Sequence, residues 1–222
     1  NGDAEPLYRR SLQMREVIFG KDHSTVANSL NDLALVLRGE GRTTEAKPLF
    51  QRSHEIFSKL YGENHPDLAA LLHNLALIYE EEDCSADAER YYRKSMLIWE
   101  NTLGPDHPHV GTSLCCQASL LLRQGRYAEA LPMWERAVKM PESALGKYDP
   151  RTIETVVSYT HTLFRLERFS ECEVLYRYIL MASERIYGAS SHKAGQACHY
   201  LANTLAELNR YDDANAYYAK AL

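Results

Sequence analysis

Apolar residues recur along the chain with the three-and-four spacing that places them on one face of a helix. One such face comprises Leu30, Leu33, Ala34 and Leu37, and it returns 42 residues later as Leu72, Leu75, Ala76 and Tyr79. The pattern predicts two helices in each segment of this length. We expect the first, helix A, at 24–39, 66–81, 108–123, 150–165 and 192–207. We expect the second, helix B, at 3–19, 44–61, 86–103, 128–145, 170–187 and 212–222.

Three further sets of residues keep the same period, and residues that share one position of the period are called a column below. A glycine column consists of Gly20, Gly62, Gly104, Gly146 and Gly188. A small-residue column consists of Ala4, Ala46, Ala88, Ala130, Cys172 and Ala214, and an aromatic column of Tyr8, Phe50, Tyr92, Trp134, Tyr176 and Tyr218. A strict period of this kind predicts stacked helical repeats. Small side chains let helices A and B approach closely, and we expect the rings to fill the space between neighbouring pairs.

The turns from helix A to helix B hold residues suited to left-handed backbone. Gly41 and Gly125 lie there, and Asp83 and Asn209 in the same column tolerate that conformation better than most residues. Glu167 is the fifth member of the column, and we expect its turn to differ slightly.

The linkers from helix B to helix A carry capping signals. The glycine column is expected to end each helix B. An Asp or Asn after four of these glycines is predicted to cap the next helix A; the predicted caps are Asp22, Asn64, Asp106 and Asp149. In three repeats a Pro occupies the first position of helix A, which suits that position. Pro141, inside a predicted helix B, predicts a local bend.

Composition narrows the function classes. The chain has 222 residues, of which 45% are hydrophobic, and a net charge of −5 from 25 basic and 30 acidic residues. This balance argues against binding to nucleic acid or to an anionic membrane surface. No apolar run approaches 20 residues. Five cysteines without paired spacing favour a reducing compartment, so we expect the cytoplasm, with a cytoskeletal or ciliary site as the alternative.

The columns resemble the consensus of the tetratricopeptide repeat family. The matching residues are Leu33, Ala34, Leu37, Gly41, Ala46, Phe50 and Ser53, then Leu75, Ala76, Tyr79, Ala88, Tyr92 and Ser95, then Leu201, Ala202, Leu205, Ala214, Tyr218 and Ala221. The longer repeat and the Leu-Gly-x-Asp-His-Pro linker at 103–108 are similar to the kinesin light chain type, which nephrocystin-like, ciliary and bacterial signalling proteins share. The resemblance implies an all-α, right-handed α-solenoid of tandem antiparallel helix pairs.

The resemblance divides the chain into one array of repeat pieces. These are 1–23, 24–65, 66–107, 108–149, 150–191 and 192–222. Both ends cut through a repeat, so we expect the chain to be an excerpt of a longer protein.

The same resemblance places one face of helix A, called the inner face below, in a concave groove. Its first row is Asn28, Ala70, Thr112, Glu154 and Gln196; its second is Asn31, His73, Cys115, Val157 and His199; its third is Leu35, Leu77, Ser119, His161 and Asn203. Such side chains suit a peptide backbone and small apolar groups. A solvated wall without a ligand is the alternative.

The charges on the inner face indicate which kinds of peptide it could bind. None of these fifteen residues is Lys or Arg, which argues against the carboxylate clamp of chaperone-binding relatives and weakens the case for an acidic cargo peptide. Arg38, Arg123 and Arg165 at the ends of A helices form either a basic ledge or a favourable charge at a helix C-terminus.

The histidines of the linkers, the adjacent cysteines and an acidic run are expected to have structural roles. His23, His65 and His107 share one column that spreads along a stack, so we expect roles in caps or turns and no metal site. Cys115 and Cys116 are adjacent and are expected to be core or groove thiols. The acidic run 80–83 is expected to be a solvated helix end, although it could also repel acidic ligands. No catalytic or cofactor motif is present, so we expect no enzyme activity and no cofactor.

Three functions remain. The first is a non-catalytic adaptor that binds a peptide or helix in the groove, as kinesin light chains bind cargo. The second is a structural subunit of a cytoskeletal or ciliary assembly, attached by its back or ends. The third is the regulatory arm of an enzyme or signalling protein whose active domain lies outside this chain.

Overall fold

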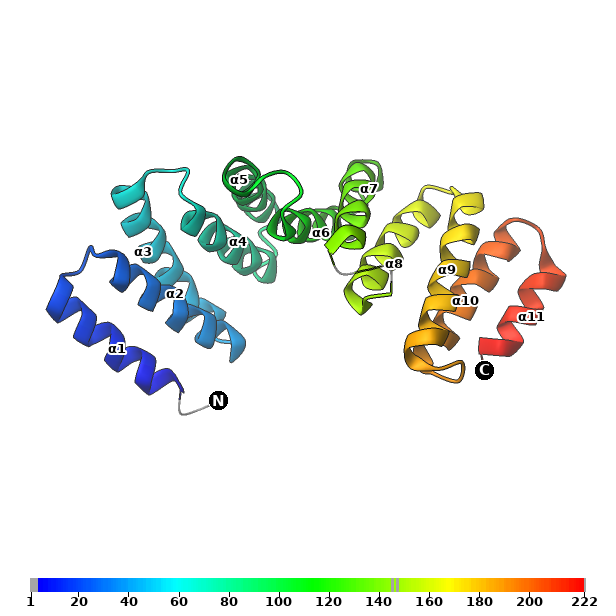
Figure 1. Ribbon diagram of the computed structural model, residues 1–222, viewed down its shortest axis with the longest axis horizontal. Coiled ribbons are helices and arrows are strands. Elements are labelled where there is room, and N and C mark those ends of the chain that lie inside the picture. Colours follow the sequence, from blue (N-terminus) through cyan, green and yellow to red (C-terminus); the bar gives the residue numbers. More distant parts are fainter. Residues whose placement is uncertain (1–3, 145, 147, 222) are drawn as a thin grey trace. The chain divides into compact units, whose positions relative to one another are not determined.

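The computed structural model describes residues 4–144, 146 and 148–221, and for 141–144 it describes the backbone alone. These residues form helices and turns, with no strand among them. The helices are α1 (Ala4–Phe19), α2 (Ser24–Gly39), α3 (Thr43–Tyr61), α4 (Pro66–Glu81), α5 (Ser85–Leu103), α6 (Pro108–Arg123), α7 (Tyr127–Ala144), α8 (Pro150–Arg165), α9 (Phe169–Tyr187), α10 (His192–Glu207) and α11 (Tyr211–Ala221) (Figure 1).

The bounds confirm the predicted all-α fold of tandem helix pairs. All five A helices begin and end at the predicted residues. The B helices from α3 onward begin one residue earlier than predicted. The predictions at residues 3, 145 and 222 lie outside the described residues. None of the described helices is both long enough and apolar enough to cross a membrane.

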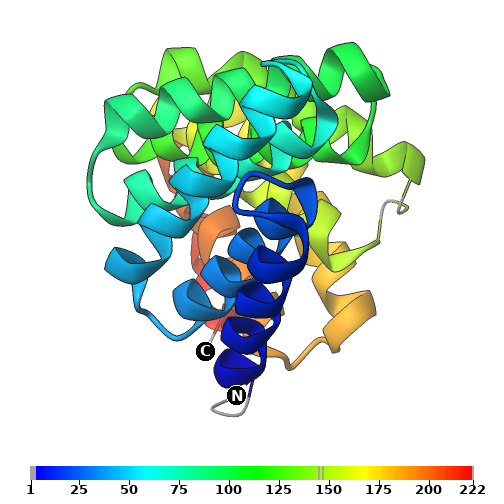
Figure 2. The ribbon, with the colours of Figure 1, turned by 90° about the vertical axis from the view of Figure 1, so that its left-hand side faces the viewer.

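The chain forms two compact units, which meet within α6 between Ser113 and Leu114 and are described separately here. In unit 1, helix B packs on helix A through the predicted columns. Ala46 and Ala88 are fully buried, as are the rings of Phe50 and Tyr92. Ser53 Oγ donates to the Ala27 carbonyl oxygen at 2.7 Å, which ties α3 to α2. Figure 2 shows α1 beside α2 at the start of this unit, where the two helices are in contact.

Unit 2 repeats this arrangement with its own core. The core lies between α8, α9 and α10 and includes Val156, Leu163, Tyr176, Leu201 and Leu205. Cys172 takes the place of the column's alanine, is fully buried, and lies with its Sγ 3.5 Å from the Thr160 carbonyl oxygen. Cys172 therefore acts as the small buried residue that its column predicts.

All five turns from helix A to helix B have the same conformation, so the expectation that the turn at Glu167 differs is wrong. Glu167 has φ 59°, close to the 57° of Asp83 and the 60° of Asn209. Its amide donates to the Phe164 carbonyl, and the next amide, of Arg168, donates to the Leu163 carbonyl. This pair of bonds is the Schellman motif and recurs at every A–B turn. Packing of the flanking helices imposes the left-handed backbone on a residue that disfavours it.

The glycine column has a different backbone from the A–B turns. Gly62, Gly104 and Gly188 combine φ of 77° to 95° with ψ of 153° to 177°. This region is open essentially to glycine alone. That explains why the column is all glycine, whereas the A–B turns also accept Asp, Asn and Glu.

The caps of helix A differ in part from the prediction. The N-cap residues are His23, His65 and His107 in three repeats, each with ring Nδ1 accepting the amide two residues later, at 3.2–3.3 Å. Asp22, Asn64 and Asp106 precede these caps and are not themselves the caps. Asp149, which stands in the histidine column, caps α8 as predicted and accepts the Arg151 amide at 2.9 Å. The imidazole replaces a carboxylate because it offers an acceptor at the same reach.

Pro141 does not end its helix, because α7 continues to Ala144. Its side chain lies outside the described residues, and a bend at this position stays a prediction.

Candidate functional site

The predicted inner face lies at the surface in each unit. All five residues of the first row, from Asn28 to Gln196, are exposed. Those of the second and third rows are exposed or half-buried, and none of the fifteen is buried. The neighbouring positions Leu33, Ala34 and Leu37 of the same helices are fully buried. The A helices therefore present one face to the core and leave the predicted face accessible.

Two asparagines of unit 1 form a polar bridge across this face. Asn74 Nδ2 of α4 donates to Asn31 Oδ1 of α2 at 3.3 Å. Both side chains are half-buried. Asn31 is therefore engaged within the fold.

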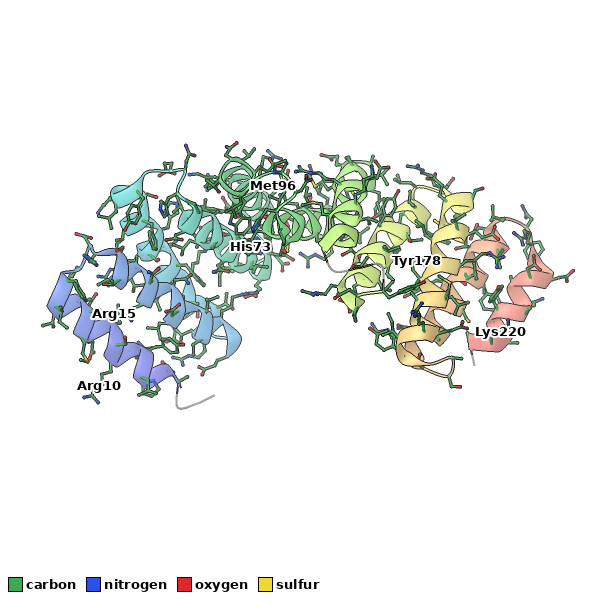
Figure 3. The ribbon with its side chains drawn as sticks, viewed as in Figure 1. Arg10, Arg15, His73, Met96, Tyr178 and Lys220 are labelled. Carbon is green, nitrogen blue, oxygen red and sulfur yellow. The ribbon has the colours of Figure 1, made fainter. Side chains whose placement is uncertain are left out.

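His73 is wedged between helices, so it is neither simply exposed nor free to contact a ligand. Its ring centroid lies 5.2 Å from that of Tyr92 and 5.5 Å from that of Trp99, both on α5. Its Nδ1 lies 3.5 Å from Ser113 Oγ of α6. Figure 3 shows His73 where α4 meets α5. Burial, with a smaller contribution from the positive charge of Arg38, lowers the pKa of His73 to about 4, so the ring is neutral at pH 7.

The acidic run at the end of α4 makes ion pairs at the surface, so the expectation of a solvated helix end holds for the exposed Glu81 and Asp83 and only in part for the half-buried Glu80 and Glu82. Glu81 pairs with Arg38 of α2 at 2.8 Å and accepts the Thr43 hydroxyl at 2.9 Å. Glu82 pairs with Lys47 of α3 at 2.6 Å. Arg38 is thus paired with a carboxylate of its own chain, so it is less available to bind an acidic ligand as the predicted basic ledge would.

The other two acids of this run are Glu80, which is half-buried, and Asp83, which is exposed. Glu80 Oε2 accepts the hydroxyl of Tyr92 at 2.7 Å. This bond links the aromatic column to the end of helix A, where an unpaired carboxylate would lose solvation.

The two predicted arginines of unit 2 lie at the ends of α6 and α8, and both are exposed. The Arg165 guanidinium carbon lies 5.0 Å from the centre of the Tyr127 ring. Burial and then the charge of Arg165 lower the pKa of His161 in the third row. This end of α8 therefore carries positive charge near the inner face.

The thiols do not form a metal site. None of the five cysteines forms a disulfide, and Cys115 is half-buried with Sγ 3.9 Å from Thr155 Oγ1. Burial raises the pKa of Cys115, so the thiol stays protonated at pH 7. Within the part of the chain that the structure describes, no group of three or more His, Cys, Asp or Glu side chains could hold an ion.

Unit 2 contains a cavity on the inner face, between α8 and α10. It has a volume of about 220 Å³. Three predicted residues line it, namely Glu154, Val157 and Gln196. Sequence reasoning missed the other lining residues Pro150, Ile153, Ser158, Ile179, Ser183, Tyr187, Lys193, Ala197 and Tyr200. The sequence feature that could have indicated this cavity is Ser183, a small residue in the column that holds Phe57 and Trp99 in unit 1.

Two predicted residues also line a larger hollow of about 790 Å³ against α10 and α11. They are Gln196 and His199, with Tyr200, Tyr218 and Lys220 nearby. The His199 ring centroid lies 5.8 Å from that of Tyr218. The Tyr218 hydroxyl donates to Asn203 Oδ1 at 2.7 Å, so Asn203 is engaged within the fold.

Comparison with protein families gives matches described as tetratricopeptide repeat. One family model covers residues 25–85 and 69–143, which together exceed half of the chain. A second model of the same description covers 1–25 and 195–222. A comparison with curated protein sequences gives no match.

Several solved structures share the fold at low sequence identity. BtubC (BKLC) from P. vanneervenii is 14% identical with a TM-score of 0.78, over 98% of this chain and 87% of that one. A kinesin light chain-type protein of Podosopora anserina with nearly identical TPR-like repeats is 19% identical with a TM-score of 0.77, over 90% and 94%. YrrB, described as a TPR protein with an unusual peptide-binding site, is 15% identical with a TM-score of 0.67, over 94% and 89%.

Proposed function

Because the chain belongs to the tetratricopeptide repeat family, we propose that it is a non-catalytic adaptor that binds a peptide or helix of a partner protein on the inner face of its A helices. The observation that supports this most is the exposure of all five first-row residues, Asn28, Ala70, Thr112, Glu154 and Gln196, on helices that bury another face in the core. A rigid, preformed face lowers the entropic cost of holding an extended partner. The peptide-binding site named for the structural neighbour YrrB is consistent with such a use of the fold.

The side chains of this face favour a particular kind of ligand. They offer amide, hydroxyl and imidazole groups for a peptide backbone and short apolar groups for side chains. Lys and Arg are missing from the three rows, and Arg38 is held by Glu81. We therefore propose a largely uncharged peptide segment and argue against a carboxylate clamp. A cargo-adaptor role like that of kinesin light chains, in the cytoplasm or on the cytoskeleton, belongs to the same proposal.

The test compares two matched double variants in an affinity capture from lysate, read by mass spectrometry. Asn28→Arg with Gln196→Arg places bulky charge on exposed positions of the inner face in both units. The control, Gln51→Arg with Asn215→Arg, makes the same changes of residue type at exposed positions of helix B. Asn31 and Asn203 are less suitable targets because each accepts an internal hydrogen bond.

A partner captured by the parent and the control but lost from the inner-face variant would support the adaptor. The same complex captured by all three proteins would contradict it and favour a structural subunit held by helix B or by the ends. Exposed apolar side chains on helix B, such as Val174 and Met181, are what that second function would use. Helix α1 exposes six more, namely Leu7, Tyr8, Met14, Val17, Ile18 and Phe19.

A further inference from the structure

One column of helix B holds a large ring in α3 and α5 of unit 1 and a serine in α9 of unit 2, with Arg15 and Pro141 as its other members. Phe57 of α3 and Trp99 of α5 are 2% and 5% exposed. The equivalent residue of α9 is Ser183, which is 3% exposed. The preceding column changes in the same direction, from Ile98 to Ala182. At these two positions the side chains of α9 are therefore much smaller than those of α5.

In unit 1 the ring of Trp99 fills the position that corresponds to Ser183. It lies between two consecutive A helices, with its centroid 5.5 Å from the His73 ring of α4 and 4.9 Å from the His109 ring of α6. The Trp99 and His109 rings are stacked, with an interplanar angle of 26°.

The cavity of unit 2 lies at the equivalent place. Val157 stands in the column of His73, and Lys193 in the column of His109. Both line the cavity together with Ser183. Ile179, where α5 has Ser95, restores some volume, yet about 220 Å³ remains. An apolar cavity of about 150 Å³ already holds a benzene ring.

The cavity opens toward the inner face. Its floor consists of buried side chains, among them Ile153, Ile179 and Ala197. Its rim consists of the exposed residues Glu154, Lys193, Gln196, Tyr187 and Tyr200. A side chain that enters from the inner face would thus meet an apolar floor.

We propose that this cavity, called the ring pocket below, receives an aromatic side chain of the segment bound on the inner face of unit 2. The proposal rests on the function proposed above and names the ligand chemistry of one part of that face. An aromatic ring fits because the same place in unit 1 is filled by the protein's own tryptophan. Lys193 at the rim can lie against the ring as a cation, at the position where the His109 ring stacks on Trp99 in unit 1. Gln196 and Ser158 stand beside the pocket and offer hydrogen bonds to the flanking backbone.

The first test uses N-acetyl-tryptophanamide as the probe and methyl NMR spectra of the isoleucine-labelled protein. We expect the Ile153 and Ile179 signals to shift in a saturable way at millimolar probe. The Ile56 and Ile98 signals, in the repeats that carry their own rings, should stay in place, and N-acetyl-alaninamide should move none of the four. Unmoved Ile153 and Ile179 signals at saturating probe would overturn the ring pocket.

The second test fills the pocket from within. Ser183→Trp and Ser183→Phe supply the ring that α5 and α3 already have, and Ser183→Ala is the control that leaves the pocket open. We expect both ring variants to fold, to keep or raise the melting temperature, and to abolish the probe shifts, while Ser183→Ala keeps them. If Ser183→Trp overpacks against Ile179, the smaller Ser183→Phe decides. Probe shifts that persist in a folded ring variant would contradict the proposal.

A peptide display selection separates this inference from the adaptor function. If peptides selected by the parent share an aromatic residue, we expect its replacement by alanine, or Ser183→Phe in the protein, to weaken binding by about tenfold to a hundredfold. Selected peptides that lack an aromatic residue and bind Ser183→Phe equally well would overturn the ring pocket and leave the adaptor standing. If no peptide is selected, the adaptor proposal fails, and the probe spectra alone decide whether the pocket takes a ring.

Discussion

At the scale of single residues, the A–B turns show how the fold can override local preference. Five turns share one hydrogen-bond pattern, and their central residues are Gly41, Asp83, Gly125, Glu167 and Asn209. Left-handed backbone costs an ordinary L-residue about 1–2 kcal/mol. Glu167 has no backbone advantage here, so the flanking helices must hold it in place.

We expect Glu167→Gly to stabilise unit 2 by about 0.5–1 kcal/mol, because relief of the left-handed strain exceeds the added entropy of the unfolded chain. Urea unfolding followed by circular dichroism would measure this. The reciprocal control, Gly125→Glu, should destabilise by about 1 kcal/mol, since a Cβ at Gly125 meets nothing within 4 Å and only the backbone changes. Equal stability of all three proteins would show that the turns carry no strain.

His73 makes stability depend on pH. Its pKa falls from 6.5 to about 4 in the fold, chiefly through burial. As the pH drops below 6.5, the unfolded chain takes up this proton and the folded chain does not. The contribution of His73 is therefore fully present above pH 6.5 and is lost as the pH falls toward 4, by roughly 3 kcal/mol in total.

The expected signature is a free energy of unfolding that decreases between pH 6.5 and 4, with a shallower slope in His73→Asn. Asparagine is the residue of the same column in α2, at Asn31, so it suits the site. Urea titrations at four pH values would measure the slope. His161→Asn serves as the comparison, with a smaller effect because His161 is exposed. A slope in His73→Asn equal to that of the parent would assign the pH dependence to other groups.

At the scale of helices, the small-residue column sets how closely A and B pack. Ala46, Ala88 and Ala130 are fully buried. Charges on successive B helices add a second, weaker link: Arg42, the N-cap residue of α3, pairs with Glu5 of α1 at 2.6 Å. Solvent screens such surface pairs, so they contribute little to stability. A substitution that separates helices A and B is therefore expected to cost more stability than the loss of one ion pair.

Ala88→Trp should destabilise unit 1 by about 3 kcal/mol or more, because a fully buried methyl position cannot hold an indole without moving α4 from α5. A thermal melt followed by circular dichroism would measure the loss. Ala86→Trp is the matched control on the same helix, at an exposed position, and should melt near the parent temperature. A parent-like melt for Ala88→Trp would mean that this column does not face helix A.

At the scale of the whole molecule, contacts join helices that are neighbours in the sequence. The α4–α5, α2–α3 and α9–α10 pairs are in extensive contact, as are α10 and α11. In such an array, stability is close to a sum of repeat and nearest-neighbour terms. A local defect should therefore stay local.

Amide hydrogen exchange of the Ala88→Trp variant would test this. We expect protection to fall in α4 and α5 while the amides of α9 and α10 in unit 2 keep the protection they have in the parent. Loss of protection throughout the chain would instead show that the two units unfold together.

Much of the fold could be predicted because its signals are local and repeated. The three-and-four spacing around Leu30 and Leu72 fixed the bounds of helix A, and the alanine and aromatic columns identified the buried face of helix B. The inner face followed from the resemblance and the same register. The ring pocket could not be predicted from any one helix, because α8, α9 and α10 each contribute part of its wall.

The sequence by itself determined the helices, their pairing and the residues that each pair buries, because period and side-chain size act within one repeat. Only the tertiary structure decided what depends on distances between repeats. It placed His73 among the rings of α5, engaged the acids of α4 with α2 and α3, and left space beside Ser183 where α3 and α5 hold a ring. It also forced Glu167 into a turn that its own backbone preference would reject. Packing energy summed over two helices outweighs the preference of one residue.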